Sequence, residues 1–186
     1  MGDPAHEAPA GGVESVVDDV EFELSGHRLR VETVLSSWVP PDGLVSAAFA
    51  MAFDHQDRIL LVRLADRDWH PTGGHREPGE AAVDTAVREA AEEGGCRVRI
   101  LGPVGLQRIT MLDEAPEEWP YPLPTGYQVF FSARIEADQS PRPGTEATEA
   151  ALFAPAEARA LEWVQRWSWL YEAALGQVMA ATIVGD

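Results

Sequence analysis

Cysteine, basic residues and long apolar runs are all scarce in this chain of 186 residues. Its one cysteine, Cys96, excludes an internal disulfide and suits a reducing compartment, so a cytoplasmic location is expected. The 14 Lys and Arg residues stand against 31 Asp and Glu, and the net charge of −17 argues against a nucleic-acid duplex as a partner. No apolar run approaches the roughly 20 residues that cross a membrane, so no membrane partner is expected.

What is present fits one domain with a proper core, since 45% of the residues are hydrophobic. Residues 1–18 are acidic and lack the pattern of a secretory signal, which predicts a flexible N-terminal tail. Residues 19–41 are expected to form an N-terminal strand extension, and residues 42–186 the main domain with its C-terminal helix. An N-terminal addition of this kind could support a homodimer or help to bind substrate.

Periodicity predicts an α/β fold built around a mixed β-sheet. Helices are expected at residues 81–93 and 161–179. Residues 113–125 hold four prolines and can form neither a helix nor a central strand, so a long loop is expected there. The expected strands are residues 20–24, 29–38, 44–53, 58–64, 97–101, 105–112, 127–135 and 150–153.

The predicted helix at residues 81–93 separates apolar from charged positions. Its expected apolar face consists of Val83, Ala86, Val87 and Ala90. The opposite stripe consists of Thr85, Arg88, Glu89, Glu92 and Glu93. Three carboxylates one turn apart destabilise a helix unless positive charge lies among them. A hard divalent cation with oxygen ligands, such as Mg²⁺, would supply that charge.

Residues 74–96 read GHREPGEAAVDTAVREAAEEGGC. This spacing resembles the Nudix box, the signature of the Nudix hydrolases, which cleave the pyrophosphate of a nucleoside diphosphate linked to another group. The matching positions are Gly74, Glu80, Arg88, Glu89, Glu92, Glu93 and Gly95. The resemblance implies a three-layer α/β/α sandwich over about residues 42–180. Ala90 and Cys96 are smaller than the usual aliphatic residues, which should loosen the core slightly and leave the charged face intact.

The resemblance also implies roles for individual residues. Glu89, Glu92 and Glu93 are expected to bind Mg²⁺ or Mn²⁺, joined by a backbone carbonyl of Gly73 or Gly74. Arg88 is expected to orient the glutamates and to pair with Glu80. Either Glu92 or Glu93 is the candidate for the general base that takes a proton from the attacking water.

The residues that contact substrate are less well specified. His75 and Arg76 lie beside the glycine loop and either contact a phosphate or are ordinary loop residues. Relatives often supply a further acid before the last core strand, where Glu149 is preferred here over Glu146. The Trp-Pro-Tyr-Pro segment at residue 119 partly resembles an element of the NADH-cleaving Nudix branch. Its aromatic residues, or Tyr127, would then stack on a base or simply pack the loop.

A small-molecule nucleotide is therefore the expected substrate. No proline stands about fifteen residues beyond the box, where the resemblance would place a marker of ADP-ribose cleavage. This favours a nucleoside triphosphate, ordinary or damaged. The alternatives are an ADP-ribose or dinucleotide pyrophosphatase, and a catalytically silent domain that senses nucleotides.

Overall fold

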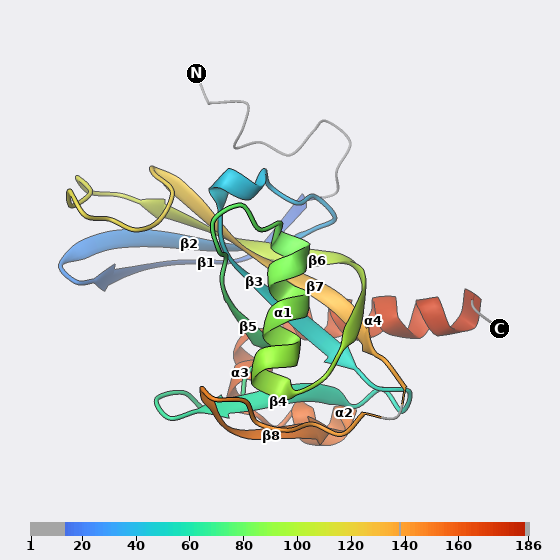
Figure 1. The fold of residues 1–186 in the computed structure, drawn as a ribbon. Helices are drawn as coiled ribbons and strands as arrows, with labels where there is room; N and C mark the ends of the chain where they lie inside the picture. Colours follow the sequence, from blue (N-terminus) through green and yellow to red (C-terminus); the bar gives the residue numbers. More distant parts are fainter. Residues whose placement is uncertain (1–13, 138, 185–186) are drawn as a thin grey trace.

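The computed structural model describes residues 14–137 and 139–184, which form one twisted sheet with helices on both faces (Figure 1). A short 3-10 helix, η2 (Asp42–Leu44), precedes the third strand. The strands are β1 (Glu14–Leu24), β2 (His27–Ser36), β3 (Val45–Phe53), β4 (Ile59–Leu64), β5 (Thr72–His75), β6 (Val98–Met111), β7 (Thr125–Ile135) and β8 (Ala147–Phe153). The α-helices are α1 (Ala82–Gly94), α2 (Pro155–Ala158), α3 (Glu162–Arg166) and α4 (Ser168–Val184).

The sheet is mixed, as predicted. Its order is β1-β2-β6-β7-β3-β4-β8, and β5 pairs with β3 beside this path. The β3–β7 pairing is parallel, whereas the other strand pairings are antiparallel. The predicted α/β class is therefore confirmed. Within the described part of the chain, no helix is both long and apolar enough to cross a membrane.

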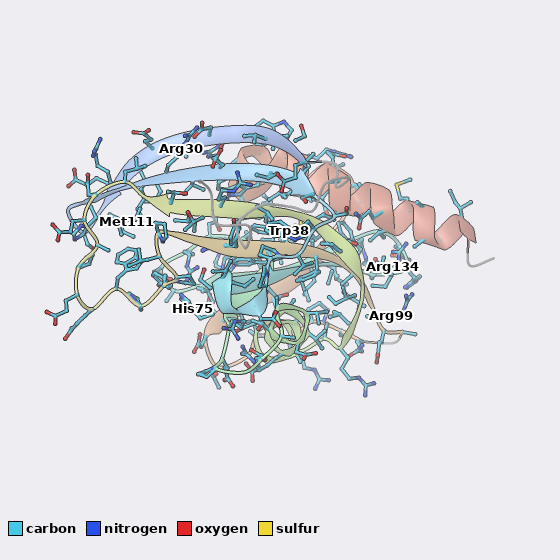
Figure 2. The ribbon with its side chains drawn as sticks, turned by 90° about the horizontal axis from the view of Figure 1, so that it is seen from above. Arg30, Trp38, His75, Arg99, Met111 and Arg134 are labelled. Atoms are coloured by element: carbon cyan, nitrogen blue, oxygen red, sulfur yellow. The ribbon has the colours of Figure 1, made fainter. Side chains whose placement is uncertain are left out.

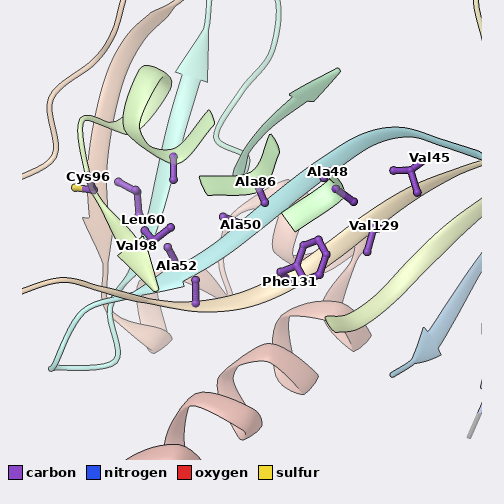
Figure 3. Packing of buried hydrophobic residues seen from close by; sticks show 13 residues of the cluster. Val45, Ala48, Ala50, Ala52, Leu60, Ala86, Cys96, Val98, Val129 and Phe131 are labelled. Carbon is purple, nitrogen blue, oxygen red and sulfur yellow. The ribbon is translucent and has the colours of Figure 1, made fainter. Parts of the chain in front are cut away.

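Two hydrophobic clusters lie on opposite faces of the sheet. On one face α1 packs through Ala86 and Ala90 against Ala48 and Ala50 of β3 (Figure 3). These small side chains let the helix lie close to the strand. On the other face α2, α3 and α4 cover larger residues such as Phe53. Seen from above, α1 and α4 lie on opposite sides of the strands (Figure 2).

The N-terminal hairpin begins earlier than predicted. Residues 1–13 of the expected tail lie outside the described residues, but residues 14–18 belong to β1 and pair with β2. Assigning these five residues to a flexible tail was therefore wrong. Their polar character misled the prediction, because β1 is an edge strand whose residues are mostly exposed or half-buried. Ser25 and Gly26 both have positive φ and form the turn between β1 and β2, as expected.

Several other element boundaries also differ. The two strands predicted at residues 97–112 are one strand, β6, with irregular register near Gly102 and Pro103. The predicted C-terminal helix is divided at Trp167, whose φ of −117° and ψ of 35° end α3. The glycine loop contains β5, which was not predicted, because a strand of four residues with two glycines carries no alternating pattern.

Candidate active site

Helix α1 carries most of the candidate site, and both of its ends are fixed by specific residues. The Asp42 carboxylate accepts a hydrogen bond of 3.0 Å from the Ala82 amide and so caps the first turn. Gly95, with φ of 66°, ends the helix in the left-handed conformation. The predicted apolar face needs two corrections. Val83 is 38% exposed, whereas Thr85 is fully buried and donates to Glu80 Oε2 over 2.7 Å.

Arg88 is the centre of the charged face of α1. Its guanidinium contacts Glu80 Oε1 at 2.9 Å, Glu89 Oε1 at 2.8 Å and Glu92 Oε2 at 2.9 Å. It also donates a hydrogen bond of 3.2 Å to the backbone carbonyl of His75 in β5. One positive side chain thus organises three carboxylates and ties the helix to the glycine strand. This arrangement suits the orienting role expected for Arg88.

Glu80 is held in its charged form. Besides the ion pair with Arg88, it accepts hydrogen bonds from Thr85 Oγ1 and from the Glu77 amide. The Arg88 guanidinium is the largest cause that lowers the pKa of Glu80 to about 2. A carboxylate so firmly ionised is a poor proton acceptor near neutral pH. Glu80 therefore fixes the Arg88 side chain by direct contact, and its expected place among the catalytic residues remains a prediction.

Glu93 lies in the opposite electrostatic situation. Its side chain is buried, and its Oε2 accepts a hydrogen bond of 2.9 Å from the Gly73 amide. Burial raises the pKa of Glu93 to about 7, and the neighbouring charge of Glu89 acts in the same direction. Burial likewise raises the pKa of Glu89. These two groups form a crowded acidic pair that Arg88 compensates only in part.

Two glycines of β5 allow the strand to lie against these carboxylates. A Cβ at Gly74 would be 2.5 Å from Glu89 Oε1, and a Cβ at Gly73 would be 2.3 Å from the Phe49 ring. Any side chain at Gly74 would therefore push the Glu89 carboxylate away. Gly74 was expected to supply a metal-binding carbonyl, and the structure places its backbone directly beside Glu89.

The loop before β8 closes over the end of α1. The Arg142 amide donates to the Gly94 carbonyl over 2.9 Å, and the Gly144 amide donates to the Glu93 carbonyl over 3.0 Å. Two residues later, the negative charge of Glu146 contributes to raising the pKa of both Glu89 and Glu93. The charge of Glu146 therefore acts on both carboxylates of the site.

The structure does not place Glu149, the preferred loop acid, beside the carboxylates of α1, and its role remains a prediction. Glu149 lies on β8, with a side chain 53% exposed, and forms an ion pair of 2.8 Å with Arg63 of β4. The two residues are partners in the β4–β8 register, so strand pairing directs Glu149 away from α1. The sequence offers two acids three residues apart, and only the position where β8 begins decides between them.

Tyr127 is also not a substrate-binding residue. Its side chain is fully buried in a cluster with Val34 and Leu106. Its ring lies edge-on to Trp38, with 5.7 Å between the centroids, and burial raises the pKa of its hydroxyl. A ring without exposed surface cannot stack on a nucleotide base. The prediction failed because a tyrosine next to a proline-rich loop resembles a binding residue until its strand face is known.

His75 and Arg76 lie at the end of β5, on the side of the proline-rich loop. The His75 ring stacks on Tyr121, with 5.6 Å between centroids, and its Nε2 is 3.1 Å from the Tyr121 hydroxyl. Arg76 donates to the carbonyls of Val45 and Glu80, over 3.1 and 2.8 Å. Both residues border a hollow of about 600 Å³. The structure thus gives each a structural role beside an open space, and their expected contact with phosphate remains a prediction.

The charge balance of the site fits a divalent cation. In the described residues, no three His, Cys, Asp or Glu side chains converge as a ready-made ligand set. Arg88 instead holds the carboxylates of Glu89 and Glu92. The donors are nevertheless hard oxygens, and they outnumber the positive charge of Arg88. This set of a buried Glu93, a partly buried Glu89 and an exposed Glu92 therefore suits Mg²⁺ or Mn²⁺, which binds few protein carboxylates and keeps other positions for water and phosphate.

Several residues at this site carry no local sequence signal. Asp42 caps α1 from 40 residues away, and Gly144 approaches the Glu92 carbonyl so closely that a Cβ there would overlap it. Arg67, in the loop after β4, acts on the pKa of Glu93 through its charge. Only the tertiary fold brings these residues to the helix.

The fold and the site define an α/β sandwich in which an arginine organises carboxylates beside a glycine strand, the arrangement implied by the Nudix box. A family model of the NUDIX domain matches residues 43–172. The chain therefore belongs to the Nudix hydrolase family.

Two curated relatives are similar to parts of the chain. The chain is 33% identical over 101 residues to a protein of Bacillus subtilis (strain 168) named "Putative 8-oxo-dGTP diphosphatase", covering 53% of this chain and 59% of the relative. It is 30% identical over 117 residues to an isopentenyl-diphosphate Delta-isomerase of Streptomyces griseus, covering 59% of each. The chain thus spans about three fifths of the length of these relatives.

Solved structures support the fold. The structure of a mutant of the Bacillus subtilis pyrophosphohydrolase BsRppH is similar with a TM-score of 0.57 and 20% identity, covering 87% of this chain and 97% of that one. A NUDIX hydrolase from Nitrosomonas europaea is similar with a TM-score of 0.51 and 23% identity, covering 69% and 89% of the two chains. A C. elegans Ap4A hydrolase is similar with a TM-score of 0.50 and 18% identity, covering 75% of this chain and 99% of that one.

Proposed function

We propose that the protein is a divalent-metal-dependent pyrophosphohydrolase that cleaves a phosphoanhydride bond of a nucleotide. The observation that carries this proposal is the carboxylate pair Glu89 and Glu93 on α1. Arg88 holds the partly buried Glu89, and the Gly73 amide holds the buried Glu93. The family supports the reaction class. The names of the similar proteins, which include a diphosphatase, a pyrophosphohydrolase and an Ap4A hydrolase, agree with a phosphoanhydride as the bond attacked.

Glu89, Glu92 and Glu93 would hold the Mg²⁺ or Mn²⁺ ion. When bound, such an ion neutralises diphosphate charge and lowers the pKa of a water molecule. The protein's own part is to fix the carboxylates, and it does so through the chain of contacts from Glu80 to Arg88 and on to Glu89. The Gly73 amide keeps Glu93 in place from the strand side.

Of the two candidates for the general base, Glu93 is the better supported. The Glu92 side chain is 60% exposed and forms an ion pair with Arg88. Glu93 is buried, and the Gly73 amide fixes its Oε2, so its carboxylate is held in place without a bond to Arg88. We assign to Glu93 the removal of a proton from the attacking water.

The substrate favoured by the sequence is a nucleoside triphosphate, ordinary or damaged. The protein is expected to act on it in the cytoplasm. A silent nucleotide-binding domain is less well supported, because such a domain gains nothing from the mutual repulsion of the Glu89 and Glu93 carboxylates. No residue of the described site favours an isomerase activity.

The test is release of phosphate and pyrophosphate by the full chain with Mg²⁺ or Mn²⁺. The panel contains ordinary nucleoside triphosphates, 8-oxo-dGTP, ADP-ribose and diadenosine tetraphosphate. We expect turnover of at least one triphosphate and a loss of about 10²- to 10⁴-fold in Glu93→Gln, the usual contribution of a general base. Glu149→Gln is the matched control and should keep full activity, because Glu149 pairs with Arg63 outside the site. No turnover of any nucleotide with either metal would overturn the proposal.

A further inference from the structure

The sheet face opposite α1 contains a pair of glutamines with no evident structural role. Gln107 of β6 and Gln128 of β7 are directly opposed in the register of these strands. Gln128 faces the same side as Phe130, two residues further along β7, which packs in the cluster beneath α3 and α4. Both glutamines therefore lie on the face opposite the carboxylate helix.

The side-chain amides of these glutamines are available for binding. Gln107 is 8% exposed and Gln128 is half-buried. Neither side-chain amide forms a hydrogen bond with another described residue. By contrast, the side-chain amides of Gln139 and Gln177 are both hydrogen-bonded. Polar groups that are largely removed from water normally have a partner. A ligand seated here would supply it.

Aromatic rings surround the two amides. Phe49 and Phe130 stack with 4.8 Å between centroids and an interplanar angle of 12°, and together with Trp163 and Trp167 they line a cavity of about 200 Å³ that includes both glutamines. Both tryptophans are half-buried, so part of each ring is open to the cavity. Flat apolar walls around a pair of amides match the faces and the edge of a nucleobase.

A third unpartnered group lines the same cavity. His70 is 6% exposed, and its Nδ1 is 2.8 Å from the Pro71 carbonyl, an acceptor, so Nδ1 carries the proton. The other nitrogen, Nε2, is then a buried acceptor, and it has no partner among the described residues. Burial also lowers the pKa of His70, which keeps the ring neutral. An N–H donor on the ligand would satisfy it.

The cavity and the carboxylates of the Nudix box lie on opposite sides of β3, and the neighbouring strand β5 connects them. Phe49 lies against Gly73, whose amide binds Glu93. Arg67 lines the cavity and also acts on Glu93 through its positive charge. We therefore expect the phosphates of a ligand whose ring lies in this cavity to extend past Arg67 and β5 toward Glu93.

We infer that this cavity binds the nucleobase of the substrate, with the amides of Gln107 and Gln128 reading the base edge. A glutamine amide presents a donor and an acceptor side by side, as the edge of a base does. An isoprenyl chain would leave both amides unpaired, and a bare polyphosphate would not use the aromatic walls. The inference rests on the proposed function, because it names the part of the substrate that the hydrolase recognises.

The test measures binding rather than turnover. The full chain with Mg²⁺ is titrated calorimetrically with the 5′-(β,γ-imido)triphosphates of adenosine, guanosine, cytidine and uridine, and with tripolyphosphate, which has no base. In Gln107→Met and Gln128→Met we expect the preferred nucleotide to bind about tenfold more weakly. Tripolyphosphate should bind as before. Gln165→Met is the matched control, since Gln165 is exposed on α3 and lines no part of the cavity.

The outcomes separate this inference from the proposed function. Hydrolysis that persists while neither variant changes nucleotide binding would overturn the base site alone. Equal weakening of nucleotide and tripolyphosphate would show that the glutamines only support the fold, and would also overturn it. Base-dependent binding that the variants abolish, in a protein without turnover, would support the site and reject the hydrolase. Gln128→Glu, which keeps the shape and removes the donor, repeats the test if a Met variant unfolds.

Discussion

The backbone amide of Gly73 donates a hydrogen bond of 2.9 Å to Glu93 Oε2, which joins the glycine strand to the carboxylate helix. This single bond holds a carboxylate that is only 5% exposed. Burial opposes its charge more strongly than the bond supports it, so the pKa of Glu93 rises to about 7. The charged form of Glu93, which a cation would require, is therefore unfavourable in the metal-free protein.

Glu93→Gln should stabilise the metal-free protein at pH 8 and have little effect at pH 5. The pKa of Glu93 is about 7 in the folded chain and ordinarily 4.5, so its contribution to stability is full below 4.5 and is lost as pH rises through 7. Glutamine imitates the protonated form and can still accept from Gly73. We expect a gain of about 1–3 kcal/mol at pH 8, measured by urea unfolding with a chelator. An equal change in stability at both pH values would show that the raised pKa of Glu93 is not its cause.

Gly74→Ala should abolish most activity while the protein stays folded. The new Cβ would lie 2.5 Å from Glu89 Oε1, and the carboxylate is a flexible end that can move aside. Glu89 would then leave the position expected of a metal ligand, so kcat should fall by about 100-fold and more Mg²⁺ should be needed. Activity against Mg²⁺ concentration measures both effects.

Gly176→Ala serves as the control for Gly74→Ala. Gly176 lies within α4, and a Cβ there would meet nothing within 4 Å. Alanine should therefore stabilise the helix by about 0.5–1 kcal/mol without changing kcat. If both alanine variants lost activity equally, close packing at Gly74 would not be the cause.

The features of the fold and of the site that could be predicted are those set by the local spacing of residues in the sequence. The Nudix box fixes which residues of α1 share a face, so the meeting of Arg88 with Glu89 and Glu92 could be foreseen from the sequence, and the mixed sheet followed from alternating segments. The choice between Glu146 and Glu149 depends on where β8 begins its pairing with β4. The burial of Tyr127 depends on which face of β7 lies toward α1. Both are tertiary properties that strand periodicity alone leaves undecided.

Glu80→Gln should destabilise the protein and lower kcat together. Glu80 and Arg88 are 15% and 23% exposed, and Glu80 has a pKa of about 2 instead of 4.5. Its contribution to stability is therefore present above pH 4.5 and is lost as pH falls through 2. We expect a loss of about 1–3 kcal/mol at pH 7 that shrinks toward pH 3, measured by urea unfolding. Glu172→Gln, in an exposed pair with Arg159, should cost no more than about 0.5 kcal/mol.

Glu146→Gln should lower activity, whereas Glu149→Gln should not. The charge of Glu146 reaches Glu89 and Glu93, and the loop that carries it is bound to the end of α1 through Gly144. Removing this charge weakens the attraction of the site for a divalent cation, so the Mg²⁺ concentration for half-maximal activity should rise about threefold to tenfold. Full activity in Glu146→Gln with a loss in Glu149→Gln would restore the original preference for Glu149. The Arg63 ion pair of Glu149 makes that result unexpected, because it holds the carboxylate on the β4–β8 edge.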